Sequence, residues 1–170
     1  MDAIKDRLPA AARDLKINLG VITSSTALAP AQAWTIALAS AVVTREPTLI
    51  AAVEAASQLA PEAIAAAKGA AAIMGMNNVY YRFLHYTGDE YAQLPARLRM
   101  QIIGNPGIDK LDFELACLAA SAIAGCEACV RSHEKAVRER GGSKEMVQDA
   151  VRIAAVLNGV AVALGTSDAR

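Results

Sequence analysis

Two cysteines and a histidine in the second half of the chain are the residues whose types and spacing could do chemistry. Cys126 and Cys129 form a C-x-x-C pair, and His133 follows four residues after the second cysteine. The thiolate is the reactive form of cysteine, and two thiols at this spacing can close a disulfide over a very short loop. We interpret the group as a redox-active dithiol with its own acid–base partner.

The local pattern places this group at the start of a helix. Glycines on both sides frame a helix predicted from about Cys126 to about Arg140. In that helix Cys129 and His133 are four residues apart and share one face, so the imidazole can take or return the proton of the second thiol. Cys126 falls at the first turn, where backbone N–H groups favour a charged sulfur.

A carboxylate twelve residues before the first cysteine is the further candidate. Glu114 lies in an otherwise apolar helix predicted from Asp109 to Ala124. A carboxylate there is costly to bury unless it is paired, which predicts a second acid–base group. The alternative is a solvated residue that complements the helix dipole together with Asp112. The sequence leaves both interpretations open.

A zinc site is one alternative to the dithiol. Cys126, Cys129 and His133 supply three ligands, and a structural zinc ion needs four. His85 or Cys117 could be a distant fourth ligand. The C-x-x-C spacing alone does not separate the two interpretations.

Inert core cysteines are the other alternative. The flanking Glu127 and Arg131, together with His133, predict access to water and therefore argue against it. Cys117 itself lies among alanines and is expected to fill core space. His85, near the end of a long helix, is expected to have a capping or surface role.

The composition predicts an all-α protein. Hydrophobic residues make up 54% of the 170 residues but aromatic residues only 4%, and alanine is abundant. Small side chains let helices approach closely, which is typical of a multi-helix bundle. The length fits a single domain over residues 1–170. The formal net charge of +0 gives no electrostatic case for binding nucleic acid.

Proline, glycine and serine set the expected helix boundaries. Pro30, Pro47 and Pro61 are expected to open helices, and Ser143 is expected to cap the last one. No segment alternates as a strand would. The expected helices, from the first to the last, cover about 2–18 in one or two pieces, then helices from Pro30 and from Pro47, about 62–84, 98–103, 109–124, 126–140 and 144–165, with a turn at 23–26 and an irregular stretch around 87–95.

The N-terminal part predicts neither an export signal nor a membrane span. Charged residues interrupt the first positions, and no apolar core follows them. The uncharged span from Ile17 to Thr44 is interrupted by Asn18 and Pro30, so we expect buried helix and turn there. The expected compartment is the cytoplasm, where cysteines are more often catalytic or metal-binding than structural.

An internal similarity predicts a duplicated architecture. Trp34 and Phe113 each open an alanine-rich helix, and the segments 77–79 and 158–160 fall at corresponding places. The offset of about 80 residues predicts two repeats, a degenerate one over about 30–86 and one with the active site over about 109–166. Pro47 falls where the first thiol would lie in the degenerate repeat.

With these residues in place, the chain resembles the alkyl hydroperoxidase D family, within the carboxymuconolactone-decarboxylase-like superfamily. The similarity extends over nearly the whole chain. It rests on the C-x-x-C-x-x-x-H run, on Phe113-Glu114-Leu115, and on the segments AAIMGMNNVYYR (71–82) and IIGNPGI (102–108).

The resemblance implies an antioxidant peroxidase and disulfide reductase that binds no haem, flavin or metal. It implies a homotrimer of helical subunits that reduces alkyl hydroperoxides with electrons from dihydrolipoamide. One implied partner is a two-cysteine peroxiredoxin, with which the protein would form a mixed disulfide. The other is a lipoylated acyltransferase with its dihydrolipoamide dehydrogenase. Neither nucleic acid nor a membrane is among the implied partners.

The resemblance also assigns roles to residues. Cys129 attacks the peroxide and becomes a sulfenic acid, while Cys126 donates a proton and then closes the disulfide. Glu114 and His133 act as the proton relay. Some relatives carry a histidine where this chain has Ala128, so a relay that needs that imidazole is shortened here.

Two other classes of function stay open at this point. One is a ring-opening or decarboxylating enzyme of the kind that names the superfamily, although nothing in that chemistry needs two thiols. The other is a zinc-stapled binding protein, which one tightly held zinc ion per chain would identify.

Overall fold

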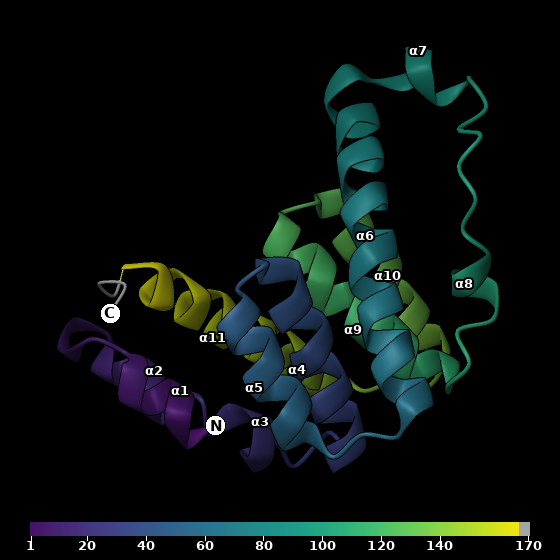
Figure 1. Ribbon diagram of the computed structural model, residues 1–170. Coiled ribbons are helices and arrows are strands. Elements are labelled where there is room, and N and C mark those ends of the chain that lie inside the picture. The colour runs from purple at the N-terminus through teal and green to yellow at the C-terminus, as the bar shows by residue number, and fades with distance from the viewer. Residues whose placement is uncertain (167–170) are drawn as a thin grey trace.

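The computed structural model describes residues 1–166, and these residues form a bundle of helices without a strand (Figure 1). The all-α prediction is therefore confirmed. In chain order the elements are α1 (Asp2–Arg7), the 3-10 helix η1 (Ala10–Ala12), α2 (Arg13–Asn18), α3 (Val21–Ser24), α4 (Pro30–Thr44), α5 (Pro47–Ser57), α6 (Pro61–Thr87), α7 (Asp89–Ala92), α8 (Gln101–Gly104), α9 (Lys110–Ala124), α10 (Glu127–Glu139) and α11 (Lys144–Thr166). Positions 167–170 of the predicted domain lie outside the described residues.

Proline and side-chain caps set most helix starts, as the sequence predicts. Pro30, Pro47 and Pro61 are the first residues of α4, α5 and α6. Proline fits there because its fixed φ suits a helix and the first turn needs no N–H. Ser143 precedes α11, and its Oγ accepts from Met146 N at 3.1 Å.

The central helices pack closely because their side chains are small. α4 contacts α6, α9 and α11, and α9 contacts α6, α10 and α11. From Thr35 to Ala41 every residue of α4 is buried, so helices cover this segment on all sides. The buried cluster extends from Ile4 to Leu164 and joins these helices into one core.

The polar run at 23–26 is partly helical, which corrects the prediction of a simple turn. Thr23 and Ser24 belong to α3, and their N–H groups donate to Gly20 O at 3.1 Å and 3.0 Å. Within the run 23–26, only the last two residues, Ser25 and Thr26, lie outside α3. Ser25 Oγ accepts from the N–H groups of Ala27 and Leu28, which turns the chain towards α4.

The stretch after α6 is also more regular than predicted. α6 continues three residues past the expected end at Leu84, and Gly88, at φ 80°, separates it from α7. The short helix expected over 98–103 is present as α8 but starts at Gln101. Figure 1 shows the end of α6 and α7 standing clear of the other helices.

Two helical hairpins have matching boundaries. α4 covers 30–44 and α9 covers 110–124, while α5 and α10 begin at 47 and 127. Both breaks use a left-handed residue, Arg45 at φ 61° and Gly125 at φ 69°. Glu46 and Cys126 are the matching N-caps, which corrects the expectation that Pro47 stands at the place of the first thiol. The division of the chain into two repeats of about 80 residues stays a prediction.

One described helix, α11, is long and apolar enough to cross a membrane by length and composition, with 44% of its most apolar window buried in the structure. It packs against α4 and α9 and contributes Ile153, Leu157 and Val160 to the core. These contacts account for its apolar character in the bundle.

Candidate active site

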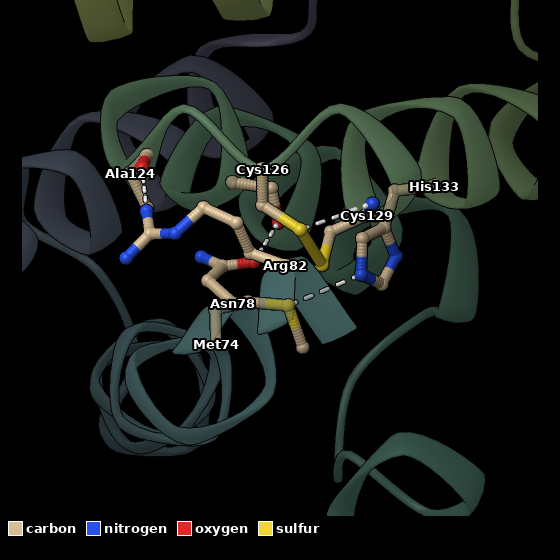
Figure 2. The surroundings of a disulfide bond; sticks show 8 residues. Met74, Asn78, Arg82, Ala124, Cys126, Cys129 and His133 are labelled. Atoms are coloured by element: carbon tan, nitrogen blue, oxygen red, sulfur yellow. Dashed lines mark hydrogen bonds between the residues drawn. A yellow bond between two sulfur atoms is a disulfide. The ribbon is translucent and has the colours of Figure 1, made fainter. Parts of the chain in front are cut away.

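The two cysteines lie at the N-terminus of α10 and are joined by a disulfide (Figure 2). Their Cα atoms are 5.3 Å apart. Cys126 is the N-cap, and its Sγ accepts from Cys129 N at 3.3 Å. When the disulfide is open, this N–H and the helix dipole would favour a charged sulfur at Cys126.

The site residues are largely buried, and the flanking charges do not mark exposure of the cysteines. Cys126 is 0% exposed, Cys129 5% and His133 9%. The charged neighbours point elsewhere: Glu127 and Arg131 are exposed and pair with each other at 2.9 Å. They lie on the outer face of α10, whereas the site residues lie on the face packed against the bundle.

Glu114 is buried and paired, which decides the question that the sequence left open. It projects from α9, is 6% exposed, and its Oε2 lies 2.7 Å from His133 Nδ1. An ionised Glu114 accepts the Nδ1–H of the ring and fixes its orientation. The other ring nitrogen, Nε2, is then the one that can exchange a proton.

Met74 contacts that second nitrogen. Its Sδ, which α6 brings to the site, lies 3.1 Å from His133 Nε2, and the side chain is 0% exposed (Figure 2). A thioether can only accept a hydrogen bond. With Nδ1–H given to Glu114, Met74 Sδ can accept a hydrogen bond from Nε2 whenever that nitrogen carries a proton. The sequence does not predict this role, because nothing in an apolar helix face signals such a contact.

A cavity of about 210 Å³ opens onto the second sulfur. Its lining consists of Asn77, Tyr81, Ala128, Cys129, Ser132 and His133. Cys126 is not part of this lining, so Cys129 is the sulfur that a small molecule meets first. Ala128 forms part of the wall beside Cys129.

The remaining candidates lie apart from the disulfide. Cys117 is a free thiol that is fully buried in α9, and burial, aided by the nearby Glu114 carboxylate, raises its pKa well above the usual range. His85 is half exposed, with Nε2 3.5 Å from Glu127 Oε2. Within residues 1–166 no three His, Cys, Asp or Glu side chains are grouped as a metal site requires. Neither residue therefore joins the cysteines as the fourth zinc ligand that the sequence allowed.

Two polar side chains of α6 hold the corner between α9 and α10. Arg82 donates to Ala124 O at 2.6 Å (Figure 2). Asn78 Oδ1 accepts from Ser121 Oγ at 3.0 Å. Ser121 O in turn accepts from Cys126 N at 3.3 Å. These contacts fix the backbone that carries the first cysteine. Sequence analysis assigned neither residue a role at the site.

Comparison with known proteins gives consistent matches. Residues 89–168 match the carboxymuconolactone decarboxylase family. A protein of Gluconacetobacter diazotrophicus is 52% identical and covers 96% of this chain and 92% of its own length. Relatives from Rhodospirillum centenum and Maricaulis maris are 50% and 52% identical, each over 96% of this chain and over 90% and 96% of their own length. All three are named alkyl hydroperoxide reductase AhpD.

Proposed function

Because this chain belongs to the alkyl hydroperoxide reductase AhpD family, we propose that it reduces alkyl hydroperoxides and protein disulfides through its C-x-x-C dithiol. One observation carries the proposal. The only site sulfur that lines the cavity, Cys129, is bonded to a second sulfur and lies beside a buried His133–Glu114 pair. A peroxide that enters the cavity therefore meets a nucleophile, a resolving thiol and a proton carrier together.

The oxidative half-reaction begins with the reduced dithiol. The Cys129 thiolate attacks the terminal oxygen of the hydroperoxide, so an S–O bond forms and the O–O bond breaks. The alkoxide leaves as an alcohol after taking the proton of Cys126, and Cys129 becomes a sulfenic acid. The Cys126 thiolate then attacks Cys129 Sγ, the S–O bond breaks, and the hydroxide leaves as water with the proton that His133 took from Cys129, which leaves the Cys126–Cys129 disulfide. The thiol pair loses two electrons and the peroxide gains them.

The His133–Glu114 pair supplies proton control for these steps. Glu114 holds the imidazole by Nδ1 at 2.7 Å, so Nε2 can take the thiol proton of Cys129 as the thiolate forms. When Nε2 carries this proton, it can donate a hydrogen bond to Met74 Sδ, 3.1 Å away. A neutral thiol elsewhere does not compete, because the raised pKa of Cys117 keeps that sulfur protonated.

A dihydrolipoyl group completes the cycle by disulfide exchange. Its first thiolate attacks Cys129 Sγ and releases the Cys126 thiolate; its second thiol then displaces Cys129 and closes the lipoyl disulfide. We propose a lipoylated acyltransferase and dihydrolipoamide dehydrogenase as the electron source, and no bound haem, flavin or metal. By the same exchange the dithiol would re-reduce a two-cysteine peroxiredoxin through a mixed disulfide. The proposed compartment is the cytoplasm.

The homotrimer belongs to the same proposal, and the surface of α6 supports it. Val79, Phe83 and Tyr86 lie three and four residues apart on α6 and are 62%, 43% and 74% exposed. Tyr91 of α7 packs on Phe83, with ring centroids 5.2 Å apart, and is itself 43% exposed. An apolar stripe of this kind on a helix that stands clear of the bundle is typical of an interface between subunits.

Cysteine variants test the function directly. The assay supplies cumene hydroperoxide, lipoamide, dihydrolipoamide dehydrogenase and NADH, and follows NADH oxidation. Cys129→Ser is expected to abolish turnover, Cys126→Ser to accumulate a sulfenic acid, and the control Cys117→Ser to retain activity. Full activity of Cys129→Ser would reject the attacking thiol. An inactive wild-type protein that opens or decarboxylates a lactone after thiol alkylation would reject the peroxidase itself.

A further inference from the structure

The side chain of Asn77 is the polar group of the cavity that the proposed chemistry leaves unused. It lies on α6, lines the same cavity as Cys129 and His133, and is 5% exposed. Its Oδ1 is buried and has no hydrogen-bond partner in the described part of the chain. A buried amide oxygen is normally paired, so an orphan at a reactive site requires an explanation.

The next residue on α6, Asn78, is also a buried amide, but its oxygen has a hydrogen-bond partner. Asn78 is 2% exposed, and its Oδ1 accepts from Ser121 Oγ at 3.0 Å. Both amides are therefore buried, but only the oxygen of Asn78, which is not part of this cavity's lining, is paired. The unpaired amide is the one next to the reactive sulfur.

We propose that the Asn77 carboxamide binds the peroxide group of the substrate, an inference that rests on the proposed peroxidase function. The terminal O–H of a hydroperoxide is a hydrogen-bond donor, and Oδ1 is the free acceptor. No hydrogen bond to another residue within 1–166 holds the amide in place, so rotation about its Cβ–Cγ bond turns Oδ1 to the cavity at little cost. This contact would hold the terminal oxygen against Cys129 Sγ.

The contact is consistent with the atoms that move in the reaction. The thiolate of Cys129 bonds to the terminal oxygen, the O–O bond breaks, and the alkoxide leaves with a proton from Cys126. The hydrogen on the terminal oxygen stays there and becomes the hydrogen of the sulfenic acid. Asn77 can therefore keep one hydrogen bond from the bound peroxide, through the transition state, to the sulfenic acid.

The test separates the two half-reactions in single-turnover experiments. Asn77→Leu has the shape of asparagine without its polar atoms, and the matched control Asn158→Leu makes the same change on the exposed face of α11. Each protein is fully reduced and mixed with cumene hydroperoxide, and disulfide formation is followed by mass. Each is then oxidised and mixed with dihydrolipoamide.

Asn77→Leu is expected to lower the second-order rate constant for peroxide by about tenfold to a hundredfold, the effect of one lost hydrogen bond to a reacting group. Its rate with dihydrolipoamide should stay within about twofold, because exchange between sulfurs uses no O–H donor. Its Tm should not fall, since the change removes an unpaired oxygen. Asn158→Leu should change neither rate, and Asn77→Ala should repeat the selective loss if the leucine variant folds poorly.

Two results would overturn the inference. One is a wild-type rate constant for peroxide in Asn77→Leu, and the other is an equal fall in both half-reactions, which indicates a general structural role. A wild-type protein that does not react with peroxide would instead reject the proposed function, and this outcome is visible before any variant is made.

Discussion

The hairpin of α4 and α5 and the hairpin of α9 and α10 have the same boundaries but different contents. Both first helices contain 15 residues, both turn through a left-handed residue, and both second helices start behind a side-chain cap. Glu46 caps the first of these and Cys126 the second. The backbone that presents the cysteines is therefore not special to the active site.

What differs is the set of side chains on this backbone. The site residues Glu114, Cys126, Cys129 and His133 have counterparts 80 positions earlier, namely Trp34, Glu46, Leu49 and Val53. Leu49 and Val53 are 0% exposed, whereas Cys129 and His133 keep 5% and 9% and reach a cavity. Where one hairpin fills its inner face with apolar side chains, the other holds a buried ion pair and leaves room for a ligand.

The comparison also indicates where stability has been given up for chemistry. A buried pair of titratable groups is often no more stabilising than apolar residues of similar volume, but removal of one partner leaves a costly unpaired charge. An apolar inner face, as in the first hairpin, contains no buried titratable group and therefore avoids both effects. Changes that exchange features between the hairpins should therefore separate activity from stability.

The largest effect is expected when His133 is replaced by the residue at the corresponding position of the first hairpin. His133→Val removes the proton carrier, so peroxide turnover should fall by about 10²–10⁴-fold. It also leaves Glu114 buried without its partner, which should cost about 3–5 kcal/mol. A coupled NADH assay measures the first effect and thermal unfolding the second.

A double variant sharpens this result. Glu114→Leu together with His133→Val makes the inner face apolar, as in the first hairpin, and should recover most of the lost stability without recovering activity. If the double variant is as unstable as the single one, the ion pair is not the source of the cost. If His133→Val retains turnover, the imidazole has no part in proton transfer.

A smaller effect is expected at Met74, whose sulfur contacts His133 of the active hairpin. Met74→Leu conserves the side-chain volume and removes the acceptor 3.1 Å from His133 Nε2. Peroxide turnover should fall about tenfold because the ring loses one of its two hydrogen bonds. The control is Met146→Leu, whose sulfur accepts from Ser143 N at 3.5 Å, outside the site. Equal activities of the two variants would show that the Met74 contact does not matter.

The sequence predicted the parts of this molecule that depend on neighbours along the chain. Proline at the first turn fixed the starts of α4, α5 and α6, and the spacing of Cys129 and His133 gave their common face. The charges of Glu127 and Arg131 predicted access to water for the neighbouring cysteines, but these charges do not describe the whole of α10. They describe only its outer face.

The contacts that α6 makes could not be predicted. Met74 and Asn77 reach the site from about 50 residues away, and each lies in an apolar or amide-rich run with no local signal of chemistry. Their contacts depend on how α6 packs against α10. The pairing of Glu114 with His133 is of the same kind, although the apolar surroundings of Glu114 at least raised the question of a partner.

The polar contact between the two hairpins gives a weaker, pH-dependent test. Gln32 and Asp112 occupy corresponding positions, and Gln32 Nε2 donates to Asp112 Oδ1 at 2.6 Å. Burial raises the pKa of Asp112; the Gln32 hydrogen bond opposes this effect, and Asp109 adds to it. A folded pKa above the unfolded value means that folding disfavours the carboxylate. The resulting loss of stability is absent below the unfolded pKa of about 3.9 and complete above the folded pKa.

Asp112→Asn should therefore be slightly more stable than the wild type at pH 7, because the amide oxygen can still accept from Gln32. The difference in Tm should shrink as the pH falls and vanish near pH 3. Thermal unfolding of both proteins across this range measures it. A wild type that is the more stable protein at pH 7 would show that the attraction between the carboxylate and the start of α9 outweighs its burial.

The smallest effects are expected at the two left-handed residues, and they should have opposite signs. Gly125 has φ 69° with nothing within 4 Å of an added Cβ, so Gly125→Ala meets only backbone strain, about 1 kcal/mol. Arg45 already carries that strain at φ 61°, and Arg45→Gly should relieve a similar amount. For a chain of this length each change shifts Tm by about 2–4 °C, down for the first and up for the second. If both changes shift Tm in the same direction, backbone strain does not control the stability of both turns, despite their matching φ angles.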